Sequence, residues 1–145
     1  MSPRRFIFSG SPWEALAGHS RAVVDGRWVF VSGTVGYDAR AGRLPDGAEA
    51  QAEVALDIIE GALRDADATV LDVVRVRVYI ADRSDVAAVS GVIKKRLGAA
   101  RAPNTTVCTA LAVEEARVEI EVTALKPLRR RPATRRRTRA RRRPR

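Results

Sequence analysis

Hydrophobic and polar side chains alternate along most of the chain, and the period of the alternation changes from one segment to the next. Period-two runs over residues 5–8, 20–24 and 27–32 predict three strands. The second and third runs flank Asp25-Gly26, which predicts a β-hairpin closed by a type I′ turn, because that turn needs positive φ at both central residues. The chain is therefore expected to begin with β structure.

A helical period follows a glycine-rich loop. Residues 50–66 repeat apolar side chains at i+4 steps, as in Val54 and Ile58, which predicts an amphipathic helix. A second helix is predicted from residue 84 or 85 to Leu97, where Gly98 ends it. Both helices should have one face against a hydrophobic core.

Three further strands are predicted at residues 73–81, 105–110 and 118–124, where the period returns to two. The first of them carries one apolar row and one polar row; the apolar row is Val74, Val76, Val78 and Ile80. The order of elements implies an α+β sandwich, a mixed sheet with two helices packed on one face.

The face of the sheet away from the helices would carry charged side chains. Arg75, Arg77, Glu119 and Glu121 alternate with the apolar row of their strands. Charged groups are not buried alone, because desolvation without a partner is costly. This face is therefore solvent-exposed or an interface in which the charges pair, and the length of the sheet favours an interface.

Charge divides the chain into two parts. The formal net charge is +10, but Lys126 and eleven arginines within residues 129–145 supply 12 of the 27 basic residues. The other 15 face all 17 acidic residues, so residues 1–125 carry a net charge of −2. We predict one domain over residues 1–125 and a tail over residues 126–145, disordered when alone because it has almost nothing to bury.

Composition excludes several classes of protein. A single cysteine and a single histidine rule out an intrachain disulfide and a His/Cys zinc cluster, so no metal and no cofactor are expected. Cys108 is predicted to pack as a small apolar residue. The apolar run at residues 6–8 is too short for a signal peptide, and no run is long enough for a membrane span. A cytoplasmic protein is expected.

Four segments together carry a family resemblance. The hairpin ends in VFVSGTVGYD, the first helix begins AEAQAEVALDIIEGAL, the next strand reads VVRVRVYIADRSD, and the last strands lie within RAPNTTVCTALAVEEARVEIEV. In this order they resemble the Rid family, also called RidA or YjgF/L-PSP, over residues 4–125. The resemblance implies a chorismate-mutase-like fold and a homotrimer with its sheets inward, its helices outside and a small-molecule site at each subunit interface.

The resemblance also implies an activity and its residues. Family members hydrolyse enamines and imines, such as 2-aminoacrylate, to ketoacids and ammonia without a cofactor. Their arginine that clamps the substrate carboxylate is replaced here by Asn104, which offers amide donors but no charge. The glutamate that positions water corresponds to Glu119, and His19 replaces an aromatic hydroxyl. The other ligand-binding positions correspond to Ser32, Gly33, Ser90 and Thr106.

Three of these residues also have plainer interpretations. Glu119 could form a cross-strand ion pair with Arg75 or Arg77. His19 is the best general acid or base by its ordinary pKa, yet a histidine after glycine is often a turn residue. Asn104 could bond its own backbone in an Asx turn.

Three functions remain open at this point. The first is an enamine/imine deaminase-like hydrolase whose substrate is not a simple amino-acid imine. The second is a non-catalytic trimer that binds a small metabolite, which the missing arginine favours. The third is an RNA-associated protein or ribonuclease acting with residues 129–145, whose arginines would bind phosphates without sequence preference. Those arginines could equally form a solubilising extension.

Overall fold

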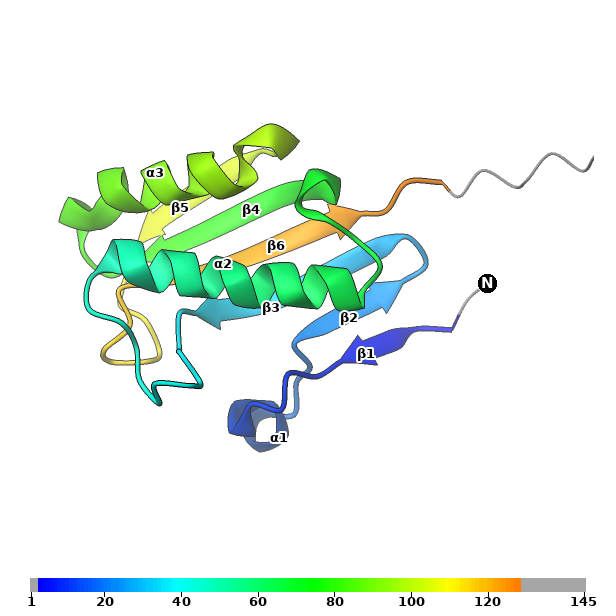
Figure 1. Cartoon of the computed structure of the whole chain (residues 1–145), viewed down its shortest axis with the longest axis horizontal. Coiled ribbons are helices and arrows are strands. Elements are labelled where there is room, and N and C mark those ends of the chain that lie inside the picture. The colour runs from blue at the N-terminus through cyan, green and yellow to red at the C-terminus, as the bar shows by residue number, and fades with distance from the viewer. Residues whose placement is uncertain (1–2, 129–145) are drawn as a thin grey trace, which may run out of the picture.

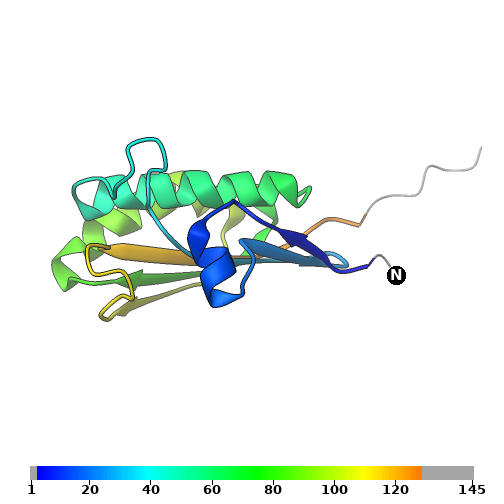
Figure 2. The same cartoon turned by 90° about the horizontal axis from the view of Figure 1, so that it is seen from below.

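A computed structural model describes residues 3–128. Six strands form one mixed sheet, and two long helices cover one of its faces (Figures 1 and 2). The strands are β1 (Arg5–Ile7), β2 (Ala22–Asp25), β3 (Trp28–Val35), β4 (Val73–Ile80), β5 (Asn104–Cys108) and β6 (Val118–Leu125). The helices are α1 (Pro12–Ala17), α2 (Ala48–Asp65) and α3 (Val86–Leu97), with 3₁₀ turns η1 (Val70–Asp72), η2 (Arg83–Asp85) and η3 (Gly98–Ala100).

The strand order is β1-β2-β3-β6-β4-β5. The pair β4 and β5 is parallel, and the other neighbouring pairs are antiparallel. The predicted α+β architecture, with two helices on one face of a mixed sheet, is therefore confirmed. The tail predicted from residue 126 lies almost wholly outside the described residues, which end at Leu128.

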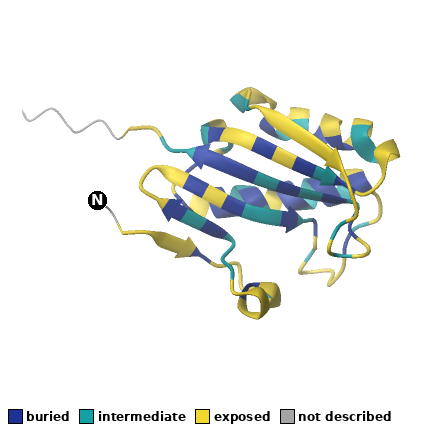
Figure 3. Cartoon of the chain, turned by 180° about the vertical axis from the view of Figure 1, so that it is seen from behind, coloured by how far each residue is buried: buried dark blue, intermediate teal, exposed yellow. Residues whose placement is uncertain are grey.

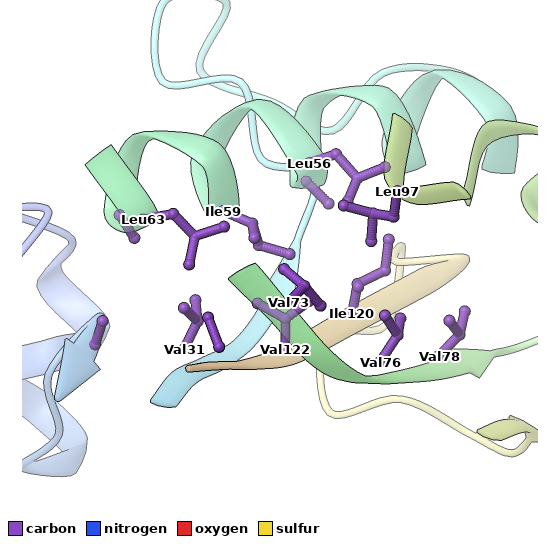
Figure 4. Packing of buried hydrophobic residues seen from close by; sticks show 14 of the residues in the cluster. Val31, Leu56, Ile59, Leu63, Val73, Val76, Val78, Leu97, Ile120 and Val122 are labelled. Carbon is purple, nitrogen blue, oxygen red and sulfur yellow. The ribbon is translucent and has the colours of Figure 1, made fainter. Parts of the chain in front are cut away.

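The hydrophobic core lies between the sheet and the two long helices (Figure 4). The α2 side chains Leu56, Ile59 and Leu63 are almost fully buried and face the sheet, where Ile120 and Val122 of β6 lie. Burying a side chain of this size contributes about 1.5–3 kcal/mol to folding. This packing fixes the helix face of each strand, and it leaves the opposite face of the sheet uncovered.

Arg96 is the centre of the ion-pair network between helices α3 and α2. Arg96 donates hydrogen bonds to the carboxylates of Glu53, Asp57 and Glu60 along α2. The three carboxylates follow the helical repeat, so they lie on one side of α2. This network fixes the position of α3 over the strands at its end of the sheet.

Two β-bulges change which residues face the core. Pairing with β6 shifts between Val73 and Arg75 in β4, and between Val31 and Thr34 in β3. The prediction that Val74 belongs to the apolar row is wrong, because Val73 is buried whereas Val74 is 37% exposed. A bulge inserts one extra residue, so every side chain before it changes face relative to strict alternation.

The hairpin is closed one residue later than predicted. Asp25 pairs with Trp28, so the central turn residues are Gly26 and Arg27. Of these two, Gly26 has a positive φ, 58°, and Arg27 does not, which fits a type II′ turn and not type I′. The register that results pairs Val24 with Val29, both buried against the helix layer.

The uncovered face of the sheet, which we call the open face, is partly apolar. Figure 3 shows it from behind, with exposed positions alternating with buried ones along the longer strands. One cross-strand row runs from Phe6 through Val23 and Phe30 to Thr123 and Arg75. Its member Phe30 is 44% exposed and stacks on the neighbouring Trp28 ring, with 6.2 Å between ring centroids. No helix within residues 3–128 is long and apolar enough to cross a membrane.

Candidate functional site

Glu119 lies directly over Gly33 on the open face. It is on β6, where it pairs with Val35 of β3 just after the β3 bulge. A Cβ atom added at Gly33 would overlap Glu119 Oε1, so the carboxylate lies against the glycine backbone and would have to move aside for any larger residue at this position. Ser32, Gly33 and Glu119, which the family resemblance assigns to the site, therefore form one local feature.

The carboxylate of Glu119 has no partner among the described residues. Arg77 Nη1 forms an ion pair with Oε1 of Glu121, the next residue on the same face of β6, at 3.1 Å. Arg75 donates a hydrogen bond to Thr123 Oγ1 at 3.2 Å. The interpretation of Glu119 as half of a cross-strand ion pair with Arg75 or Arg77 is therefore wrong. Pairing across an antiparallel ladder follows the register, and the register puts Tyr79 opposite Glu119.

The surroundings of Glu119 disfavour its ionised form. Burial raises the pKa of the Glu119 carboxyl above its ordinary value, and the negative charge of Glu121 raises it further. The positive charge of Arg21 acts in the opposite direction and does not cancel these effects. A half-buried carboxylate with a raised pKa and no protein partner has the properties of a general base.

Arg21 supports the β3 bulge from within. Its Nη1 atom donates to Thr34 Oγ1 at 2.6 Å and to the Gly33 carbonyl at 3.2 Å. Its side chain is 11% exposed, and Nε lies 3.9 Å from Glu14 Oε1 without a hydrogen-bond partner in the described chain. The buried guanidinium of Arg21 therefore fixes Gly33 and Thr34, the two residues of the peptide beneath Glu119.

Glu14 completes this buried pair. It is 5% exposed and lies on α1, where its carboxylate accepts hydrogen bonds from the Ser9 hydroxyl and the Ser9 and Gly10 amides. Burial alone would raise the pKa of Glu14, but these hydrogen bonds and the charge of Arg21 together lower it. The pair is therefore ionised at neutral pH.

Neither α1 nor this buried pair was predicted from the sequence. A helix of six residues is too short for a hydrophobic period, and its signals are Pro12 at the first turn and Gly18 at the C-cap, where φ is 66°. Nothing in the sequence links Glu14 to Arg21, because strand β2 places the arginine only after the chain has folded back.

Ser32 and His19 lie beside this feature. Ser32 Oγ donates to the carbonyl of Ser20 at 2.8 Å, which connects the β3 bulge to the start of β2. His19 precedes Ser20, and its backbone amide donates to the Glu14 carbonyl at the end of α1. Its half-buried imidazole makes no hydrogen bond within residues 3–128. His19 is thus both the residue that follows the helix cap and a side chain available for proton transfer.

The other predicted site residues lie elsewhere. The parallel register pairs Val76 with Asn104 and Val78 with Thr106, so both β5 side chains are on the helix face. With Ser90 and Lys94 of α3 they line a pocket of about 240 Å³ at the edge of the sheet, here called the edge pocket. Its apolar lining comes from Val78, Ile80, Val89 and Ile93.

The Asx-turn interpretation of Asn104 receives no support. Its side-chain oxygen accepts a hydrogen bond from the Thr106 hydroxyl at 2.9 Å, not from its own backbone. The prediction that Cys108 packs in the interior is also wrong, because its thiol is exposed. The cause is topological, since β5 is an edge strand and all of its residues are exposed.

The structure thus divides the predicted site in two. Glu119, Ser32 and Gly33 gather on the open face, whereas Asn104, Thr106 and Ser90 line the edge pocket on the helix face. One chain cannot bring both groups to the same ligand, because the sheet separates them.

Comparison with known proteins gives the class of this chain. The model of the endoribonuclease L-PSP family matches residues 10–126, and the chain belongs to this family, also called Rid or YjgF. A Mycobacterium tuberculosis member of the YjgF/YER057c/UK114 family has a similar crystal structure, with a TM-score of 0.78 and 39% sequence identity. The match covers 85% of this chain and 99% of that one.

Curated relatives cover the same region. A RutC family protein UK114 from Drosophila melanogaster is 33% identical over 123 residues, which is 84% of this chain and 89% of the relative. A 2-iminobutanoate/2-iminopropanoate deaminase from Capra hircus is 32% identical over 123 residues, with 84% and 90% covered. These matches confirm the family resemblance and the fold inferred from the ordered segments.

Proposed function

We propose that this protein is an imine/enamine hydrolase in which Glu119 is the general base. The observation that carries the proposal is the Glu119 carboxylate, which is half-buried over Gly33, has a raised pKa and has no partner among residues 3–128. Similarity to proteins named 2-iminobutanoate/2-iminopropanoate deaminases supports the reaction class. Hydrolysis of a C=N bond needs a base that activates water, which suits such a carboxylate.

The proposed reaction adds water to the imine carbon. Glu119 accepts a proton from water as the oxygen bonds to that carbon, and the imine nitrogen takes up a proton to give a carbinolamine. The carbinolamine hydroxyl then loses its proton and the nitrogen gains one as the C–N bond breaks, which leaves the ketone and releases ammonia. An enamine first takes a proton on carbon and loses one from nitrogen to become the imine. His19 is the proposed group for these proton transfers.

We further propose that the site forms between copies of the chain. Glu119 and the edge pocket lie on opposite faces of one sheet, so a neighbouring copy must supply the edge pocket that faces Glu119. The exposed aromatic side chains of the open face support self-association, because contiguous apolar patches commonly mark interfaces. A homotrimer with its sheets inward would bury this face.

A charge on the open face should therefore dissociate the assembly. We expect Phe30→Glu to convert a species of roughly three times the 15.8 kDa chain mass into a monomer, because the ionised carboxylate would be buried unpaired. Light scattering after size-exclusion chromatography measures the mass. Leu71→Glu is the control, since Leu71 is 65% exposed in η1 and away from this face. A monomeric wild-type chain would contradict the proposal.

Turnover tests the reaction itself. An amino-acid oxidase generates imines in situ, semicarbazide competes for them, and release of ketoacid and ammonia is followed with the wild-type chain. We expect this protein to divert imine from semicarbazide, and the yield of ketoacid and ammonia across a series of imines gives its substrate preference. Absence of turnover across acidic and neutral imines, with ligand binding retained, would instead establish a non-catalytic binding protein.

A further inference from the structure

Lys94 gives the edge pocket a cation, although it is not among the residues that the family resemblance assigns to the site. It lies four residues after Ser90, so both side chains are on the same side of α3. Asn104 and Thr106 face them from β5, two residues apart and on one side of the strand. The four polar residues thus surround a pocket with an apolar floor.

The polar groups of the pocket are mainly hydrogen-bond donors. The Thr106 hydroxyl donates to Asn104 Oδ1, which uses the acceptor of that amide and leaves its NH₂ group for a ligand. The Lys94 ammonium offers donors and has no acceptor. No acidic residue lines the pocket. A ligand that fits this arrangement must present acceptors.

The charge of Lys94 is also not neutralised within the described chain. The next two residues of α3 are paired with α2, Lys95 with Glu53 at 2.9 Å and Arg96 with Asp57 at 2.7 Å. Lys94 makes no ion pair with any residue in the range 3–128. Two other cations lie near β5. Arg101 is exposed, and Arg83 lines an adjacent hollow with Thr106 and Cys108, but neither is part of the lining of the edge pocket.

We infer that the edge pocket binds a small carboxylate and that Lys94 supplies the positive charge that Asn104 lacks. The carboxylate oxygens would accept from the Lys94 ammonium and the Asn104 amide, and the apolar body would lie against Val78 and Ile93. A volume of about 240 Å³ suits a metabolite of a few carbon atoms. The statement that this ligand is the substrate rests on the proposed function. The statement that the pocket binds a carboxylate does not.

Binding of 2-oxobutanoate tests this inference, with its methyl ester as the uncharged probe. Isothermal titration of the full chain should show saturable binding that Lys94→Gln weakens by about tenfold, roughly 1.4 kcal/mol. Binding of the ester should not change. Lys95→Gln removes the same charge one residue away and should bind like wild type. Adding Asn104→Arg to Lys94→Gln should restore binding, because a guanidinium replaces the lost ammonium.

Three results would overturn the inference: no saturable binding by wild type, equal binding by wild type and Lys94→Gln, or equal weakening by both lysine variants. The outcomes also separate this inference from the hydrolase proposal. If the wild type turns over imine and Lys94→Gln changes neither binding nor turnover, the hydrolase proposal stands and the role of Lys94 is excluded. If binding depends on Lys94 but the wild type shows no turnover, the anion-binding pocket stands and the hydrolase proposal is excluded.

Discussion

Replacing Glu119 with glutamine is expected to lower imine turnover by about 10²–10⁴-fold, the usual contribution of a general base. Glutamine keeps the size and polarity of the side chain over Gly33 but cannot accept the proton from water. The initial rate of ketoacid release in the presence of semicarbazide measures the effect. Turnover at the wild-type rate in Glu119→Gln would exclude Glu119 as the base.

The same carboxylate predicts a pH dependence. Because burial and Glu121 raise the pKa of Glu119, activity should increase with pH as this carboxyl ionises, above the ordinary glutamate range. Glu121→Gln removes the neighbouring negative charge and should shift that rise to lower pH with the maximum rate retained. It is a matched control, since it lies on the same face of β6 and pairs with Arg77. An unchanged profile would show that another group controls the rate.

The stability of Glu119→Gln shows whether a loss of activity in this variant comes from the missing base or from unfolding. A carboxyl whose pKa is higher in the folded than in the unfolded state favours folding while it is protonated. That stabilisation is complete below the unfolded pKa and is lost as pH rises through the folded value. Above the folded pKa the wild-type chain has lost it, so Glu119→Gln should be at least as stable there. Thermal unfolding at pH 7 measures this.

Removing the charge of Arg21 should have the largest effect on stability. Arg21→Leu is expected to lower the free energy of unfolding by about 3 kcal/mol, because Glu14 would stay buried without its cation. The hydrogen bonds to Gly33 and Thr34 would be lost as well. Urea unfolding followed by circular dichroism gives the free energy.

A double-mutant cycle isolates the pair from these hydrogen bonds. Glu14→Gln removes the negative charge, and adding Arg21→Leu to it should cost less than Arg21→Leu costs alone. The Arg4–Asp25 pair is the control, since both side chains are about half-exposed, and exposed pairs contribute only about 0–1 kcal/mol. Additive effects of the Glu14 and Arg21 substitutions would show that the two charges do not interact.

The fold and the family were predictable because they depend on local pattern. Alternation over residues 118–124 identified a strand with Glu119 on its polar face, and the i+4 repeat of residues 50–66 identified α2. Each pattern is a property of adjacent residues and does not require knowledge of the partner strand. The ordered segments then sufficed to place the chain in its family.

The partners of individual residues were not predictable in this way. Arg77 forms an ion pair with Glu121, and Glu119 has no partner in the described part of the chain, because of the β4–β6 register, which depends on a bulge near Val74. Lys94 lines the same pocket as Asn104 because α3 packs beside an edge strand. Neither relation has a signal in the spacing of the residues along the chain.

The sequence by itself determined the class of fold, the apolar and polar rows of its strands away from the bulges, and the identity of the candidate residues. The tertiary structure decided that Glu119 lies over Gly33 without a partner among residues 3–128, that Arg21 and Glu14 form a buried pair, and that the predicted site is divided between two faces of the sheet. The physical reason is that periodicity is local, whereas register, bulges and burial are set by contacts between segments far apart in the chain.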